Sequence, residues 1–285
     1  TKKFVSSKTF IKSFTVLLIM VSNEKLLKKE YRLVETFEGY VPTTEKGKER
    51  LRRFEKFYEE NKKFFGKKIL DLACGAGLFS NFLASKGHYV VGVDLLEDML
   101  KFARKYAPSK ENPKYIKANL LDFIPEEKFD TTLLLGNSIP HFSPKEFVKI
   151  LKSVGNKTKY FIIIYRDSIK WGFEGTFKLI IIEEMKDYDV IDLHKEYNGE
   201  KDCITRYRII YPRKEKVVDD YYLYNPGIVE GIMNAFDFSL VKREEYGKGM
   251  EEYADIYKKD WVFCLKSRNQ KNIMEIYPIA YDSLG

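Results

Sequence analysis

The residues with the clearest chemical potential lie in one short segment, residues 67–77, KKILDLACGAG. An apolar strand is expected over residues 69–72, with Asp71 near its end. Gly75 and Gly77 then permit a tight turn in which the backbone approaches a ligand closely. A helical pattern begins at Leu78, so its first N–H groups can face an anion or a polar ligand. This arrangement predicts a binding site for a small ligand.

A dinucleotide is the first candidate for this ligand. Its fingerprint requires three glycines, G-x-G-x-x-G, but Ser80 stands at the third position. The carboxylate of Asp71 would also repel a pyrophosphate and attract a cation. The order acid, small residue, glycine, any residue, glycine resembles motif I of class I S-adenosylmethionine (AdoMet) methyltransferases, whose ligand carries an amino group and a sulfonium. The alternative for the glycines is a plain turn. Cys74, inside the loop, could act as a nucleophile, but a small residue packed against the ligand is the favoured interpretation.

A second acid lies at the end of the next predicted strand, residues 88–93. Asp94 is placed to accept hydrogen bonds from two ribose hydroxyls. NAD and AdoMet sites share this geometry, so Asp94 predicts a nucleoside without identifying it. Met99, in the helix expected over residues 97–107, can lie against an adenine face or belong to the core.

These residues must be positioned by an alternating series of strands and helices. Further strands are expected over residues 115–118, 129–135 and 160–165, with a helix over residues 145–152 between the last two. Such alternation predicts a doubly wound α/β sheet with ligands at the carboxyl ends of its strands. The fold class expected is a seven-stranded, mostly parallel, Rossmann-like methyltransferase sheet.

The second half of the chain has a different pattern. Successive β-prone runs over residues 177–224, with a turn at Asn198-Gly199, predict an antiparallel β cap inserted after strand five. A last core helix is expected over residues 226–236. Residues 238–246 and 260–266 are expected to form the terminal antiparallel hairpin.

From residue 68 to residue 166 the sequence resembles the glycine and sarcosine N-methyltransferase branch of the class I methyltransferases. ILDLACGAG is similar to VLDVACGTG of that branch, and VVGVDLLEDMLKFA to its second strand and following helix. IKANLL is similar to an Ala-Asn-aromatic-Leu segment, and LLGNSIPHF to LGNSFAHL. The resemblance implies AdoMet as the cofactor, with no metal.

The resemblance also assigns residues to the cofactor site. In the Ala-Asn segment, Leu120 replaces the aromatic residue that lies beside adenine in the family. The N-terminal helices align poorly, so the arginine for the cofactor carboxylate is chosen from Arg50, Arg52 and Arg53. The expected cofactor-binding residues are Asp71, Ala73, Gly75, Gly77, Asp94, Leu95, Met99, Asn119, Leu120, Gly136, Asn137 and Arg50.

Two further residues bear on the methyl acceptor. IIIYRDS resembles the end of strand five in that branch, where an arginine binds the carboxylate of the amino-acid substrate, and Arg166 takes this position. A guanidinium suits bidentate carboxylate recognition. The alternative is an ion pair with Asp167 or a lid acid. His141 is a candidate to take or relay a proton, with a structural role as the alternative.

Composition limits the setting in which this chemistry occurs. The chain has 285 residues, with 50 Lys and Arg against 42 Asp and Glu, and the two signs are interspersed. This pattern predicts solvated helix faces rather than a surface for a polyanion. Three cysteines without C-x-x-C spacing indicate a reducing compartment, and hence the cytoplasm, and no zinc site. The apolar run over residues 14–21 is shorter than the roughly 20 residues that span a bilayer.

The predicted organisation has five parts. These are a disordered or artefactual extension (1–21), a helical segment (22–66), an AdoMet-binding core (67–166 and 226–268), a β cap (167–225) and a tail (269–285). We expect in-line methyl transfer to a small-molecule acceptor, an amine or amino acid. The alternatives are an RNA or protein methyltransferase, although GNSIPH is not the N/D-P-P-Y/F motif of base methylation, and a non-catalytic AdoMet-binding regulator. Expected partners are the acceptor and, as second possibilities, nucleic acid or another copy of the chain, but not a membrane.

Overall fold

The computed structural model describes residues 39–170, 180–184, 189–211, 215–247 and 252–260. The predicted extension (1–21) and tail (269–285) lie outside these residues, as does the apolar run at 14–21. Across the described helices, none is both long enough and apolar enough to cross a bilayer.

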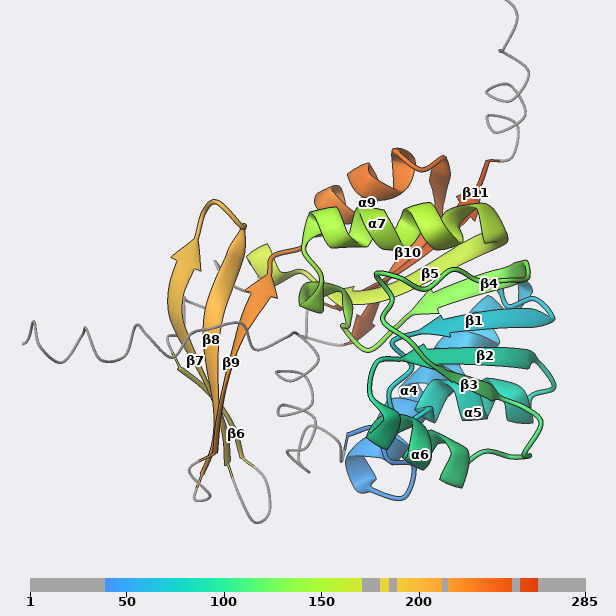
Figure 1. The fold of residues 1–285 in the computed structure, drawn as a ribbon, viewed down its shortest axis with the longest axis horizontal. Helices are drawn as coiled ribbons and strands as arrows, with labels where there is room; N and C mark the ends of the chain where they lie inside the picture. Colours follow the sequence, from blue (N-terminus) through green and yellow to red (C-terminus); the bar gives the residue numbers. More distant parts are fainter. Residues whose placement is uncertain (1–38, 171–179, 185–188, 212–214, 248–251, 261–285) are drawn as a thin grey trace, which may run out of the picture.

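The central sheet has seven strands, as predicted, in the order β10-β11-β5-β4-β1-β2-β3 (Figure 1). Five are mutually parallel, and β11 runs antiparallel to both β5 and β10. The chain order reverses between β1 and β4, so the loops after these two strands diverge and leave the ligand crevice typical of doubly wound sheets. The strands are β1 (Lys68–Leu72), β2 (Tyr89–Asp94), β3 (Lys114–Lys117), β4 (Phe129–Leu134), β5 (Thr158–Arg166), β10 (Phe238–Gly247) and β11 (Glu252–Lys259).

The predicted position of the last strand is wrong. β11 spans Glu252–Lys259 rather than residues 260–266, most of which lie outside the described part. Buried charges explain the error, because Asp255 and Lys259 interrupt an otherwise suitable apolar pattern, whereas the next residues, DWVFCLK, look more like a strand. The tertiary structure gives both charges a partner of opposite sign: Asp255 pairs with Arg243, and Lys259 Nζ lies 3.6 Å from a carboxylate oxygen of Asp237. Lys259 Nζ also donates to the carbonyl of Phe236 at 2.5 Å.

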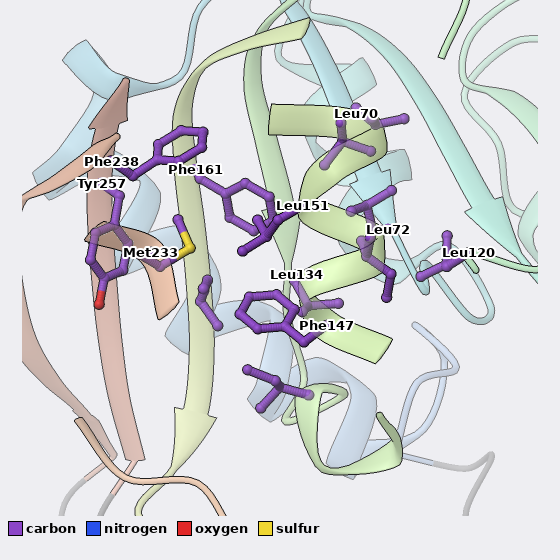
Figure 2. Packing of buried hydrophobic residues seen from close by; sticks show 14 of the residues in the cluster. Leu70, Leu72, Leu120, Leu134, Phe147, Leu151, Phe161, Met233, Phe238 and Tyr257 are labelled. Carbon is purple, nitrogen blue, oxygen red and sulfur yellow. The ribbon is translucent and has the colours of Figure 1, made fainter. Parts of the chain in front are cut away.

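Helices cover both faces of the sheet (Figure 1). On one face, α7 (Pro144–Val154) and α9 (Pro226–Asn234) enclose the larger apolar core, which is shown in Figure 2. On the other, α4 (Glu45–Asn61) and α5 (Leu78–Ser85) cover a second core rich in phenylalanine, and α6 (Glu97–Lys105) packs beside β3. Successive residues of β1 contribute to opposite cores, which is the alternation expected of a strand buried on both faces.

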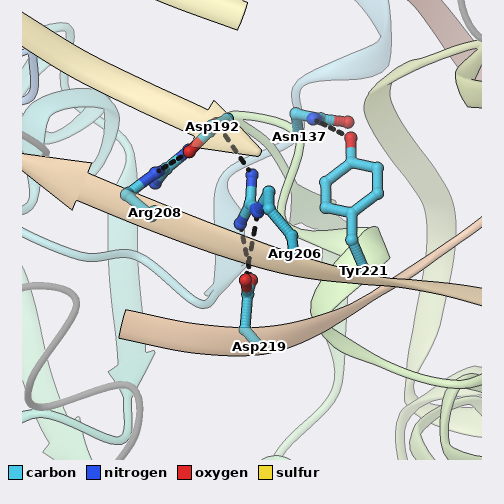
Figure 3. A network of polar contacts seen from close by, with 6 residues as sticks. All are labelled: Asn137, Asp192, Arg206, Arg208, Asp219 and Tyr221. Carbon is cyan, nitrogen blue, oxygen red and sulfur yellow. Dashed lines mark hydrogen bonds and ion pairs between the residues drawn. The ribbon is translucent and has the colours of Figure 1, made fainter. Parts of the chain in front are cut away.

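The antiparallel cap is confirmed as a separate four-stranded sheet inserted between β5 and α9. Its strands are β6 (Ile180–Glu184), β7 (Asp189–Asn198), β8 (Cys203–Tyr211) and β9 (Glu215–Tyr222), in that order. The Asn198 side chain accepts the N–H groups of Glu200 and Lys201, both at 3.1 Å, and so forms the predicted turn between β7 and β8. On one face of the cap, Arg206 lies between Asp192 and Asp219 (Figure 3).

Asp255 organises the polar part of the larger core. It is fully buried and accepts hydrogen bonds from the hydroxyls of Tyr165 and Tyr257, at 2.9 and 2.8 Å. Arg243 donates to both carboxylate oxygens, each at 2.8 Å. One carboxylate therefore satisfies groups on three strands, β5, β10 and β11, at the antiparallel side of the sheet.

Replacing Asp255 with alanine should lower the free energy of unfolding by about 3–5 kcal/mol, because Arg243 and two buried hydroxyls lose their acceptor. The measurement is chemical denaturation followed by circular dichroism. Glu245→Ala, on the exposed side of β10, is the control and should change the value by no more than about 0.5 kcal/mol. A loss of under about 1 kcal/mol in Asp255→Ala would contradict this account.

Candidate functional site

The loop after β1 has an unusual backbone that suits close contact with a ligand. Ala73, Gly75 and Gly77 have φ angles of 53°, 55° and 73°, in the left-handed region. At Gly77 a side chain would collide with Tyr115 and Ala103, so glycine is required there. At Gly75, by contrast, an added Cβ would meet no atom within 4 Å. The backbone of Gly75 therefore borders open space, into which a ligand can fit.

Asp94 connects this loop to the end of β2. Its carboxylate accepts the N–H of Gly75 at 2.8 Å and that of Leu96 at 2.9 Å. Burial raises the pKa of Asp94, and the backbone N–H groups of Leu96, Gly75 and Leu95 and the charge of His141 lower it in part. The carboxylate is thus held in place by backbone donors and stands within electrostatic range of a histidine from the loop after β4.

Asp71 occupies a different place from the one expected of a group that faces a cation. The residue is only 2% exposed, and Ser80 Oγ donates to its carboxylate at 2.5 Å. Burial raises the pKa of Asp71 to about 7, Ser80 lowers it, and the charge of Asp94 raises it further. Ser80, which stands at the third glycine position of the dinucleotide fingerprint, is therefore the hydrogen-bond partner of Asp71, and both residues lie beneath the loop.

The segment after β3 differs in part from its predicted role. Asn119 is exposed, and its side-chain oxygen accepts the N–H of Leu121 at 3.0 Å, so it closes a local turn. Leu120, predicted to lie beside adenine, is instead buried in the larger core. Met99 is buried with Leu96 in a small apolar cluster that also contains Ala76, and Leu95 packs against it.

Tyr40 completes this side of the site and was not predicted. Its ring packs against the cluster of Ala76, Leu96 and Met99, and its hydroxyl donates to the carbonyl of Gly136 at 3.1 Å. The guanidinium of Arg50 lies 4.3 Å from the ring centroid, a cation–π contact. Arg50, the arginine chosen from sequence, is thus beside the loop after β4. The only sequence signal for Tyr40 was an aromatic residue before a charged helix.

The loop after β4 is joined to β5 and to the cap by Asn137. Gly136 and Asn137 both have left-handed backbones, with φ of 67° and 59°. The Asn137 side chain accepts the N–H of Arg166 at 2.9 Å and donates to the hydroxyl of Tyr221, on β9, at 3.0 Å (Figure 3). Its backbone N–H donates to the carbonyl of Ile164 at 3.2 Å. Tyr221 in turn lies against the guanidinium of Arg206, 5.0 Å from the ring centroid.

Arg166 has an acidic partner that sequence did not identify. Its Nη2 lies 3.5 Å from Oε1 of Glu252, on β11, and Oε2 of the same acid lies 3.7 Å from Nη1 of Arg53, on α4. Asp167, one acid proposed as a partner, instead accepts the N–H of Lys170 at 2.8 Å. Arg166 is half-buried at the carboxyl end of β5, the edge of the sheet that carries the other candidate residues.

His141 and Cys74 are the remaining candidates for chemistry. His141 ends the short helix η2 (Ile139–His141), is half-buried and packs near β9 of the cap. Burial raises the pKa of the Cys74 thiol well above its usual range, so this cysteine is a poor nucleophile. Within the described residues, no group of three or more His, Cys, Asp or Glu could hold a metal ion.

Asp71→Asn should remove a pH dependence of stability. In the folded protein the Asp71 pKa is about 7, above its ordinary 3.8. Below pH 3.8 the carboxyl is protonated in both the folded and the unfolded state, so its ionisation does not lower the free energy of unfolding. Above pH 7 it is ionised in both states, and the loss of stability is largest. We therefore expect wild type to lose about 2 kcal/mol of stability relative to Asp71→Asn between pH 5.5 and 8.5 without cofactor. Denaturant titrations at several pH values measure this difference, with Asp98→Asn, exposed on α6, as a pH-independent control. A constant difference for Asp71→Asn would refute the assignment.

Comparison with known proteins agrees with this geometry. Residues 69–159 match the family model described as "Methyltransferase domain". The chain is similar to glycine N-methyltransferase of Mus musculus, with 37% identity over 84 residues (26% of this chain, 29% of that protein). It is also similar to ubiquinone biosynthesis O-methyltransferase of Glaesserella parasuis, with 40% identity over 73 residues (23% and 31%). The chain spans about a third of the length of the curated relatives it matches.

Solved structures share a larger part of the fold. The PH0226 protein of Pyrococcus horikoshii is 25% identical, with a TM-score of 0.60 over 77% of this chain and 94% of that one. An S-adenosylmethionine-dependent methyltransferase of Clostridium acetobutylicum is 16% identical, with a TM-score of 0.62 over 81% and 98%. Residues 69–159 therefore resemble a methyltransferase domain, and the sheet that contains them shares its fold with a solved S-adenosylmethionine-dependent methyltransferase.

Proposed function

We propose that this protein is an AdoMet-dependent methyltransferase that acts on a small molecule carrying an amine and a carboxylate. The observation that carries the proposal is the arrangement of Gly75 and Asp94. A glycine backbone that borders open space lies 2.8 Å from a carboxylate at the end of the next strand. This pairing suits a nucleoside whose ribose hydroxyls bind the carboxylate while its remaining part crosses the glycine loop.

The other cofactor residues follow from this placement. The apolar cluster that contains Met99, with Leu95 packed against it, would lie against adenine, and Asn119 is exposed at the same edge. Arg50, held over Tyr40, would bind the cofactor carboxylate near Gly136. Leu120 is buried in the core, so its backbone rather than its side chain would contribute. When bound, AdoMet supplies an electrophilic methyl group on a sulfonium.

The acceptor would enter from the side of the cap. There Asn137 and Tyr221 hold the loop after β4 in place, and Arg166 presents a guanidinium to a carboxylate. Orientation supplies much of the rate in such a transfer, because a neutral amine attacks directly. His141 would take the proton that the methylated amine releases.

A phenolic oxygen is the second candidate acceptor. The specific observation in its favour is the similarity to an enzyme named for O-methylation in ubiquinone biosynthesis. A phenol must lose its proton before or during attack, so this alternative requires a base. His141→Ala should then abolish transfer to phenols, whereas amine methylation at high pH would persist.

The experiment that tests the proposal has two stages. Calorimetry first measures AdoMet binding, and labelled methyl transfer is then assayed with amino acids, amines, phenols and total RNA. Transfer to amino acids supports the proposal. Transfer to RNA alone, with a steep salt dependence, would favour a nucleic-acid substrate. Binding without transfer to any acceptor would favour a regulatory protein. If AdoMet does not bind, both the methyltransferase and the AdoMet-binding regulator are refuted.

Asp94→Ala should weaken AdoMet binding by about 1–3 kcal/mol, because the ribose hydroxyls lose a charged acceptor and the loop at Gly75 loses its anchor. Calorimetry gives the dissociation constants directly. Asp98→Ala, an exposed acid on α6, is the matched control and should bind as wild type does. Unchanged affinity in Asp94→Ala would place the ribose elsewhere.

Arg166→Lys should raise the KM for a carboxylate acceptor about tenfold or more, because an ammonium cannot form the paired bonds of a guanidinium. AdoMet affinity should stay within about twofold. Steady-state kinetics and calorimetry provide the two numbers, and Arg104→Lys on α6 serves as the control. Equal losses of cofactor and acceptor binding would assign Arg166 a structural role instead.

A further inference from the structure

An ion-pair network lies on one face of the cap (Figure 3). We call it the cap network, and it consists of Asp192, Arg206, Arg208 and Asp219. In the register of β8 and β9, Arg206 is opposite Asp219, and Ile204 is opposite Tyr221. Side chains alternate between the two faces along a strand, so Arg206 and Tyr221 are diagonal neighbours on the same face.

Arg206 is the centre of the cap network. Its Nε and Nη2 donate to the two carboxylate oxygens of Asp219, at 3.0 and 2.5 Å, and its Nη1 donates to Asp192 at 3.3 Å. The Arg206 side chain is only 8% exposed, so water screens these contacts little. Burial raises the pKa of Asp192, but the hydrogen bond from Arg208 and the charges of both arginines lower it by more. Negative charges therefore hold the Arg206 guanidinium from two sides.

Tyr221 connects the cap network to the core sheet. The Arg206 guanidinium lies 5.0 Å from the centre of the Tyr221 ring, within the range of a cation–π contact. The Tyr221 hydroxyl accepts a hydrogen bond from the side chain of Asn137 at 3.0 Å. The side-chain oxygen of Asn137 in turn accepts the backbone N–H of Arg166 at 2.9 Å. A continuous series of contacts thus runs from the cap network to the end of β5.

The base of the cap is attached to the core independently of this network. The backbone N–H of Ser168 donates to the carbonyl of Tyr224 at 2.9 Å, and the N–H of Tyr224 donates to Ser168 Oγ at 3.0 Å. Tyr224 is fully buried in the larger core. Because the chain is anchored just after Tyr221, loss of the cap network should change the direction of the Tyr221 ring more than the attachment of the cap.

Two features favour a positioning role for Arg206 over a role in stability. Buried ion pairs add little to the free energy of unfolding compared with apolar residues of similar volume, and their best-attested use is to specify one arrangement. Asn137 has a left-handed backbone, with φ of 59°, which is costly for a residue other than glycine and persists only where the surroundings fix it. The hydrogen bond to Tyr221 is one such restraint, and Arg206 restrains the ring that makes it.

We propose that Arg206 is a positioning residue for methyl transfer. It holds the ring of Tyr221 so that the hydroxyl keeps the amide of Asn137, and with it the loop after β4, in the arrangement that faces the acceptor. This inference rests on the proposed function, because that loop belongs to the proposed acceptor side of the site. It makes the inserted cap part of the catalytic arrangement and adds a residue that the sequence did not assign to it.

Hydrogen exchange of the full chain, followed by NMR, tests the series of contacts without any acceptor. Arg206→Lys keeps the positive charge but cannot make the paired bonds of a guanidinium. Arg206→Lys and Tyr221→Phe should each speed exchange of the Arg166 backbone N–H about fivefold or more, because the Asn137 amide that accepts it is less restrained. Lys201→Gln, which breaks an exposed ion pair of the cap, is the control and should change this rate by less than about twofold.

Steady-state kinetics then tests the role in transfer, with the amino acid, amine or phenol that wild type methylates fastest. Arg206→Lys and Tyr221→Phe should each lower kcat about tenfold, because a small displacement of positioning groups slows the reaction. Calorimetry should find AdoMet affinity within about threefold of wild type, since Asp94 and the glycine loop are unchanged. In the double variant, kcat should be no lower than in Tyr221→Phe alone, because Arg206 acts through the hydroxyl that is already absent.

The outcomes separate this inference from the proposed function. Unchanged exchange or unchanged kcat in Arg206→Lys overturns the inference, and so does a double variant in which the two losses multiply. If Arg206→Lys does not fold, Arg206→Met combined with Asp219→Asn removes both partners of the ion pair and replaces it in both experiments. If neither variant folds, Arg206 is needed only for stability and the inference is overturned. A wild type that methylates no acceptor refutes the proposed function, whereas hydrogen exchange still decides whether Arg206 restrains Asn137.

Discussion

The loop after β4 depends on one side chain, the amide of Asn137. It accepts the backbone N–H of Arg166 and donates to Tyr221, so that it joins the loop after β4 to the end of β5 and to the cap. An amide can do this because it offers a donor and an acceptor at once, whereas a carboxylate of the same shape offers acceptors alone. The left-handed backbone at Gly136 and Asn137 aims the amide at both partners. Asn137 therefore makes a polar contact that links the cap to the core sheet.

On the cofactor side, two carboxylates at neighbouring strand ends have different roles because their surroundings differ. Asp94 is held by backbone N–H groups and borders the glycine loop, where it can accept further hydrogen bonds. Asp71 is buried beneath that loop with Ser80 as its partner, and burial brings its pKa to about 7. The expectation that Asp71 faces a cation is therefore replaced by a supporting role under the loop. The charge of Asp94 remains at its edge, where a sulfonium cofactor is attracted and a pyrophosphate is not.

Much of the fold could be predicted from the sequence because it follows from local pattern. Apolar runs bounded by glycine located β1 and β2, and the antiparallel cap followed from β-prone runs and the turn at Asn198. The position of β11 could not be predicted in the same way. Asp255 and Lys259 are buried charges whose partners lie on other elements, so the local sequence of β11 does not look apolar. Leu120 differs in another way: its position in the family motif suggested contact with adenine, whereas its side chain is buried in the larger apolar core.

The sequence alone determined the glycine loop, the acid after β2 and the order of strands and helices, because backbone freedom and hydrophobic periodicity are properties of neighbouring residues. Tertiary structure alone decided which charges share a site. Arg53 and Glu252 are far apart in the chain and meet only because β11 pairs with β5 while α4 packs over the same sheet. Tyr40 reaches Gly136 for the same reason. Such contacts depend on the packing of whole elements, and that packing leaves no periodic signal in the residues that make them.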